Sequence, residues 1–131
     1  MPAAGAMEGR AVEFVYNQRN NTLVGRNIGQ AHSFRKRLIG LLGRGRLRAG
    51  QGLWLKPCRG IHTLGMRCAI DVVFLDASQC VVGIERRLPP NRIRMQLRAA
   101  RSVLELPPGT IRATDIRLGD RLVAKHEGRC P

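Results

Sequence analysis

The sequence predicts a mainly β fold with one or two short helices, packed as a small β-sandwich or barrel in a single domain. Its apolar runs are short and separated by Gly, Pro, Asn and Asp, as is typical of strands joined by turns. Residues 72–75 are apolar at consecutive positions, which favours a central strand covered on both faces. The length of 131 residues is that of one domain. We expect this domain to span 11–126, with flexible tails at 1–10 and 127–131.

Short strands make up most of the predicted fold. Seven segments have this character: 11–16, 22–24, 52–56, 70–75, 80–85, 102–106 and 121–125. In the first, Phe14 and Tyr16 alternate onto one face. Residues 76–79 are expected to form a turn, because Asp76 and Ser78 are natural turn formers. The fourth and fifth segments should therefore pair as a hairpin.

Two helices are expected between these strands. Ser33 can cap a helix over 33–42, where apolar residues recur at helical spacing. Pro108 can open a second, short helix over 109–114, because proline is favoured in the first turn. Loops are expected at 58–65 and 92–100.

The formal net charge of +14 is the strongest anomaly of the composition. It arises from 23 Lys and Arg against 9 Asp and Glu, and it favours polyanions or acidic partners. Arginines gather in four clusters: 35–37, 44–48, 86–87 and 92–101. Phe34, directly before the first cluster, is the only aromatic residue next to a basic cluster, so platforms for stacking bases are missing. Neither a helix-turn-helix nor a zinc-finger pattern is visible, which leaves non-specific phosphate contact.

The sequence also bears on location and cofactors. No apolar run is long enough for a transmembrane helix, and the first ten residues lack the pattern of a signal peptide. We therefore expect a cytoplasmic protein without membrane contact. The 4 cysteines are expected to be free thiols there, and their spacing matches no zinc motif. No cofactor and no resident metal is predicted.

Polar residues next to the most apolar strand are the candidate site. Asp71 begins this strand, and a buried carboxylate must find hydrogen bonds or an arginine partner. Asp71 could have a structural role, through a salt bridge or through hydrogen bonds from the amides of a turn. Alternatively, it could lie at the rim of a binding pocket together with His62 and Arg67. Glu105, set among apolar residues, allows the same two alternatives.

Cys58 and His62 suggest a second kind of site. A Cys/His pair can bind zinc or copper, or act as nucleophile and base. Their spacing of four residues would place both side chains on one side of a helix. Pro57 and Gly60 favour a loop instead, and in a loop the two side chains need not lie close together. Structural roles for both residues are the stronger expectation.

Three stretches carry a family resemblance. They are Leu-Ile-Gly-Leu-Leu-Gly-Arg at 38–44, Gly-Ile-His-Thr-Leu-Gly-Met-Arg at 60–67 running into 70–76, and Val-Leu-Glu-Leu-Pro-Pro-Gly at 103–109 followed by Gly119-Asp120. Together they resemble the bacterial and archaeal family called domain of unknown function 192, over about residues 11–125. The resemblance implies a small β-sandwich-like fold with short helices and no established activity.

Three functional hypotheses follow. The first is a non-catalytic binding or accessory domain with a polar site near His62, Arg67 and Asp71, for a small ligand or an acidic partner. The second is a non-specific nucleic-acid or polyanion binder acting through the arginine clusters. The third is a thiol enzyme or metal site at Cys58 and His62.

Overall fold

The computed structural model describes residues 13–31, 47–56, 60–63, 66–95 and 99–126. In chain order the elements are β1 (Glu13–Asn17), β2 (Thr22–Ala31), β3 (Gln51–Leu55), β4 (Gly60–His62), β5 (Ile70–Leu75), β6 (Val81–Leu88), β7 (Ile93–Met95), β8 (Ser102–Leu106), α2 (Thr110–Thr114) and β9 (Leu122–His126). The predicted mainly β class is confirmed. The helix predicted at 33–42 and both predicted tails lie outside the described residues.

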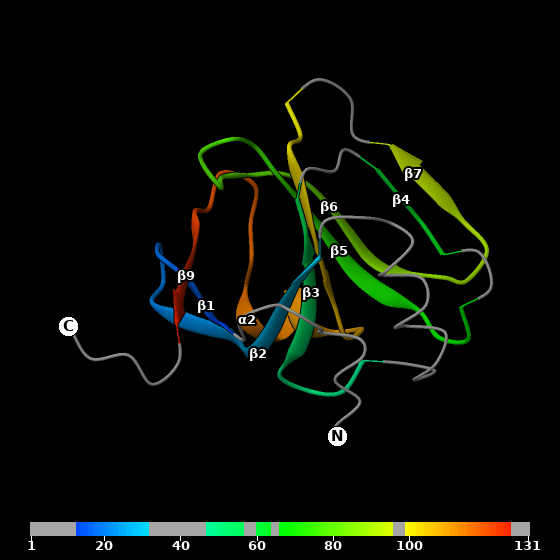
Figure 1. The fold of residues 1–131 in the computed structure, drawn as a ribbon, viewed down its shortest axis with the longest axis horizontal. Coiled ribbons are helices and arrows are strands. Elements are labelled where there is room, and N and C mark those ends of the chain that lie inside the picture. Colours follow the sequence, from blue (N-terminus) through cyan, green and yellow to red (C-terminus); the bar gives the residue numbers. More distant parts are fainter. Residues whose placement is uncertain (1–12, 32–46, 57–59, 64–65, 96–98, 127–131) are drawn as a thin grey trace.

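Seven strands form one curved sheet in the order β6-β5-β8-β3-β2-β1-β9 (Figure 1). Neighbouring strands are antiparallel except β2 and β3, which are parallel. The two edges of this sheet meet at one end, where Cys80 and Arg121 form a β-bridge. The N–H of Val81 donates to the carbonyl of Asp120 (2.8 Å), and that of Leu122 donates to Gln79 (3.0 Å). The sheet is therefore barrel-like and closed at that end.

Two apolar clusters cover the two faces of this sheet. All seven strands contribute to the inner cluster, which surrounds the fully buried Trp54. The outer cluster covers part of the sheet and contains Leu55, Leu88 and Val103. Strand β5 contributes to both clusters and is buried at every position. The expected doubly covered central strand is confirmed; burial of each such aliphatic side chain contributes about 1.5–3 kcal/mol.

The predictions of loops at 58–65 and 92–100 were wrong in part, because both segments contain a short strand. β4 and β7 pair antiparallel in a separate two-stranded sheet, with Gly60 opposite Met95 and His62 opposite Ile93. Thr63 continues this pairing, since its N–H donates to the carbonyl of Arg92 (2.8 Å). Three-residue strands are too short to show the alternation that marks a longer strand. Residues 57–59, 64–65 and 96–98 are not among those described.

The short helix predicted after the two prolines is confirmed as α2, which packs against β2 (Figure 1). Gly109 precedes it with φ of 92°, a left-handed conformation in which glycine is unstrained. The hydroxyl of Thr110 donates to the carbonyl of Pro107 (2.8 Å), and Ile111 is buried in the inner cluster. One side of this short helix therefore anchors it in the barrel.

Candidate functional site

Asp71 lies at a bulge where β5 pairs with β6. Ile70 pairs with Leu88 and Val72 with Glu85, so Asp71 faces two residues of β6 instead of one. Its Oδ1 accepts a hydrogen bond from the N–H of Arg87 (2.8 Å), and its Oδ2 accepts one from the N–H of Ile111 (2.8 Å). The side chain is buried, so this carboxylate ties the bulge to the first turn of α2.

Glu105 lies in β8 and is also fully buried. It is directly opposite Val72 on one side and Leu53 on the other. Residues directly opposite in a sheet share a face, whereas successive residues point to opposite faces. Asp71 therefore projects from the other face of the sheet than Glu105, and the fold does not bring these two candidate residues together.

The remaining predicted site residues are placed as follows. His62 is in β4, where its main chain pairs with Ile93. Arg67 is exposed in the turn before β5. Cys58 lies outside the described residues, so the structure does not describe the proposed pair with His62. Within the ranges described, no group of three His, Cys, Asp or Glu side chains could hold a metal ion.

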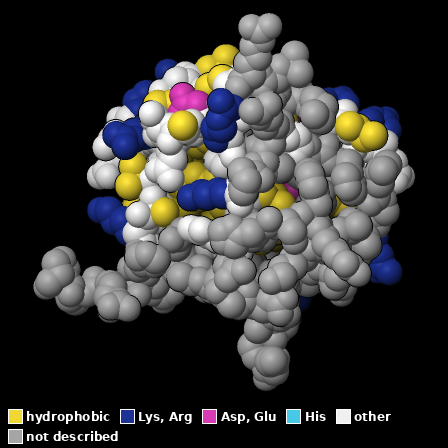
Figure 2. Space-filling model, turned by 45° about the horizontal axis from the view of Figure 1, so that its top comes forward, with side chains coloured by type: hydrophobic (Ala, Val, Ile, Leu, Met, Phe, Trp, Pro, Cys, Tyr) yellow, Lys and Arg dark blue, Asp and Glu magenta, His cyan; other side chains and the backbone are white. Residues whose placement is uncertain are grey.

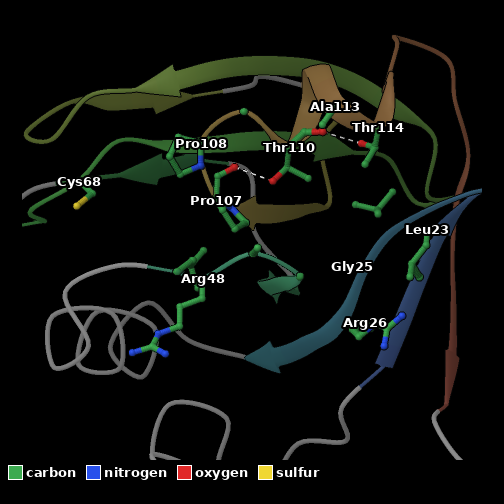
Figure 3. Close-up of a pocket in the computed structure, with 15 residues that line it drawn as sticks. Leu23, Gly25, Arg26, Arg48, Cys68, Pro107, Pro108, Thr110, Ala113 and Thr114 are labelled. Carbon is green, nitrogen blue, oxygen red and sulfur yellow. Dashed lines mark hydrogen bonds between the residues drawn. The ribbon is translucent and has the colours of Figure 1, made fainter.

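A groove that the sequence did not reveal lies between β2 and the segment carrying α2, with a volume of about 1180 Å³ (Figure 3). Its lining residues are Leu23, Val24, Gly25, Arg26, Leu47, Arg48, Ala49, Gly50, Cys68, Pro107, Pro108, Gly109, Thr110, Ala113 and Thr114. Figure 3 shows Cys68 at one end and Leu23 towards the other. Asp71 supports one wall of this groove, because it holds α2 through Ile111.

The polar character of the groove is basic. Arg26 and Arg48 are exposed at its β2 side, and the described lining contains no acidic side chain. Ion pairs of the described residues lie elsewhere: Arg19 and Arg117 with Asp115, Arg19 with Asp120, and Arg94 with Glu85. The sequence contained two signals for this site, the Gly/Arg-rich segment around Arg48 and the Pro-Pro-Gly turn, but nothing local indicated that they face each other.

Basic side chains of the described residues do not gather into one patch on the face shown in Figure 2. On the face shown in Figure 2, Lys and Arg side chains of the described residues are spaced around the molecule, between small hydrophobic areas. This distribution differs from a single basic stripe, the usual footprint of a nucleic-acid-binding face. Among the described helices, none has the length and hydropathy needed to cross a membrane.

The fold and the groove define a small barrel-like β domain with an open, basic cleft. The chain belongs to the family called domain of unknown function 192, described as “Uncharacterized ACR”, whose family model matches residues 15–124. This confirms the resemblance seen in the sequence.

Curated relatives of this chain are named as UPF0127 proteins. The chain is 42% identical over 62 residues to a UPF0127 protein of Pyrococcus furiosus, covering 47% of this chain and 53% of that protein. It is 37% identical over 62 residues to a UPF0127 protein of Pyrococcus abyssi, covering 47% and 52%. The match thus spans about half the length of these curated relatives.

Two solved structures share the fold. A protein of unknown function from Novosphingobium aromaticivorans matches with a TM-score of 0.71 and 18% identity, over 92% of this chain and 96% of that one. A protein from Sinorhizobium meliloti, described as a “putative transcription regulator”, matches with a TM-score of 0.75 and 18% identity, over 88% and 94%. At this identity the likeness establishes the fold alone.

Proposed function

We propose that this chain is a cytoplasmic, non-catalytic binding domain whose ligand occupies the groove and combines an apolar body with a negative charge. One observation carries the proposal: apolar residues and two arginines line the groove, and the described lining has no acid. A mostly apolar concave surface with a few charged groups is the usual form of a ligand site.

Two of the polar residues expected from the sequence, Asp71 and Arg67, have roles in this proposal. Asp71 acts indirectly, because its hydrogen bond to Ile111 fixes the helix that forms one wall. Arg67 precedes Cys68, which lines the groove, and adds an exposed positive charge at that end. The proposed ligand-binding surface therefore includes the neighbourhood of Arg67 and extends from there towards β2.

The test uses decanoate, with decanol as an uncharged probe of equal length and hexanoate as a shorter anion. Cys68 lines the groove and is half-buried, so a bound ligand should slow its alkylation by N-ethylmaleimide. Cys80 is also half-buried but sits at the β-bridge to Arg121, outside the groove lining, and is an internal control. Mass spectrometry of the labelled peptides separates the two thiols.

Decanoate should protect Cys68 more strongly than decanol because of the arginines. It should also protect better than hexanoate, since each buried methylene contributes about 0.8 kcal/mol. The double variant Arg26→Ala/Arg48→Ala should lose the preference for the anion. Arg112→Ala/Arg121→Ala, which removes the same charge outside the groove lining, should keep it. Equal protection by decanoate and decanol, or protection of Cys80 as well, would contradict the proposal.

Non-specific polyanion binding is the second candidate, and the net charge of +14 favours it. Such binding should weaken steeply with salt, because each phosphate contact releases counterions. Fluorescence anisotropy with random duplex and single-stranded DNA, at low and at physiological salt, measures this directly. An absence of binding at low salt would eliminate the candidate.

A further inference from the structure

The groove follows the edge of a strand. Residues 23–26 of β2 all line it, although successive side chains of a strand point to opposite faces. β2 also bulges against β1 on both sides of Gly25, so the alternation of its side chains is interrupted in this segment. The contact with four consecutive residues fits a groove beside the strand, and the pairing of β2 with its neighbours decides which of its edges the groove follows.

None of the described strands lies beside this edge of β2. β1 pairs with β2 along one side, including Leu23 and Gly25. On the other side, β3 pairs with β2 only from Asn27 onwards, where Asn27 is opposite Gln51. In the part of the chain that the structure describes, no strand therefore occupies the position beside residues 22–25.

The described residues close one end of this position without filling it. The carbonyl of Gly50 accepts hydrogen bonds from the N–H groups of Arg26 (3.1 Å) and Asn27 (3.0 Å), so the turn before β3 stops beside Arg26. The opposite wall begins with Pro107 and Pro108, which have no N–H to offer to β2. Across the groove, these two residues present apolar rings (Figure 3).

We propose, building on the proposed function, that the groove binds an extended acidic segment of a partner protein, which adds to the free edge of β2 as a further strand. Main-chain hydrogen bonds to a sheet edge give affinity in such complexes, and flanking side chains give specificity. Arg26 and Arg48 select acidic side chains. A second copy of this chain is a poor occupant, because each copy carries a net charge of +14.

The size of the free edge sets the length of the segment. A strand rises about 3.3 Å per residue, so four residues of β2 accommodate a core of roughly four to six residues of peptide. A fluorescein-labelled hexapeptide of alternating Glu and Val is a suitable probe. Its Lys/Val counterpart tests charge selection, because it has the same apolar residues and the opposite charge.

Backbone N-methylation distinguishes strand addition from simple charge attraction. One isomer of the Glu/Val peptide is methylated at every odd amide and the other at every even amide. Because only one edge of a strand faces β2, one isomer should bind at least about tenfold more weakly than the parent, and the other should bind similarly to it. Arg26→Ala/Arg48→Ala should weaken the parent peptide by a comparable factor, and Arg112→Ala/Arg121→Ala should not.

Anisotropy titrations give the outcome. Loss of binding in one isomer only, together with rejection of the Lys/Val peptide, supports strand addition. Equal binding of both isomers, or equal binding of the Lys/Val peptide, overturns it. If decanoate protects Cys68 but no peptide binds, the proposed ligand site stands and the peptide inference fails. If neither decanoate nor peptide binds, both fail.

Discussion

The Oδ2 atom of Asp71 accepts a hydrogen bond from the main-chain N–H of Ile111 at 2.8 Å, joining two points 40 residues apart in the chain. The other carboxylate oxygen accepts from the N–H of Arg87. One buried side chain thereby connects the central strand, the bulge of β6 and the helix that forms a wall of the groove.

Asp71→Ala should destabilise the protein by about 2–3 kcal/mol, because the buried amide of Ile111 and the partly buried amide of Arg87 lose a charged acceptor. Urea denaturation followed by the fluorescence of Trp54, the sole tryptophan, measures the free energy of unfolding. Asp76→Ala is the matched control. Asp76 also accepts from two amides, those of Ser78 (2.8 Å) and Cys80 (2.9 Å), but in a turn that water reaches.

The control should lose no more than about 1 kcal/mol, because water can replace the Asp76 carboxylate. Equal losses of unfolding free energy in the two variants would show that burial adds nothing to the stability that Asp71 contributes.

Stability should fall in acid because of Asp120. Burial raises the pKa of this carboxyl, but hydrogen bonds from Arg19 (2.6 Å), Asn17 (2.7 Å) and the N–H of Arg117 (2.8 Å) outweigh burial and hold the pKa below its ordinary value. A carboxyl with a lowered pKa in the folded state stabilises fully above its unfolded pKa of about 3.9. That stabilisation is lost as the pH falls through the folded pKa.

Thermal melts of the wild type and Asp120→Asn between neutral pH and about pH 2.5 test this expectation. The gap in melting temperature should be constant above about pH 5 and should close in acid, as the wild-type carboxylate takes up its proton. Asp115→Asn should show a smaller gap, because Asp115 is exposed, although hydrogen bonds from Arg117 and then Arg19 also lower its pKa. A gap for Asp120→Asn that does not change with pH would refute the charge-based account.

Thr63→Val should loosen the loop after β6. The hydroxyl of Thr63 donates to the carbonyl of Pro89 (2.7 Å) and accepts from the N–H of Arg92 (2.8 Å). Valine has nearly the same shape but neither hydrogen bond, so we expect a loss of about 1–3 kcal/mol. Amide hydrogen exchange should quicken at Arg92. Thr63→Ser keeps the hydroxyl and should leave that exchange rate close to wild type, whereas a rate raised equally in both variants would mean that the shape of the side chain, rather than its hydroxyl, sets the exchange rate.

Local patterns predicted the strands that form the central part of the sheet. Strand β5 and strand β8 begin and end where the sequence indicated, because a mostly apolar segment is bounded by Asp76 in the first and by Pro107 in the second. β2 is longer than predicted, because Gly25 and Gly29 interrupt its apolar pattern while pairing with β3 supports its second half. Pairing between distant segments is not encoded in a local pattern.

The groove could not be predicted for the same reason. Its walls come from β2, from the turn at Arg48 and from the segment after Pro107, and only the order of strands in the sheet brings them together. The importance of Asp71 could be inferred from a carboxylate in an apolar strand, but its partners Arg87 and Ile111 could not. Their amides become available through a bulge and a helix start, which are features of the folded chain.

Gly52→Ala should be strongly destabilising, because the barrel has no room for a methyl group there. A Cβ at this position would lie 2.6 Å from Cδ1 of Ile28, 2.9 Å from the carbonyl oxygen of Glu105 and 3.0 Å from Cδ2 of Leu106. Overpacking of this kind costs about 1–3 kcal/mol, and the carbonyl belongs to the adjacent strand β8, so it cannot move alone. Urea denaturation of the variant gives the loss.

The double variant Gly52→Ala/Ile28→Val separates the contact with the Ile28 side chain from the contacts with β8. Valine lacks Cδ1, so it removes the closest contact but leaves the carbonyl of Glu105 in place. Ile28→Val alone should cost about 0.5–1.5 kcal/mol, because Ile28 is fully buried. The double variant should therefore be more stable than the sum of the two single losses indicates, with a coupling of about 0.5–3 kcal/mol. Additive losses would mean that the carbonyl of Glu105 and the side chain of Leu106, rather than the side chain of Ile28, exclude the methyl group.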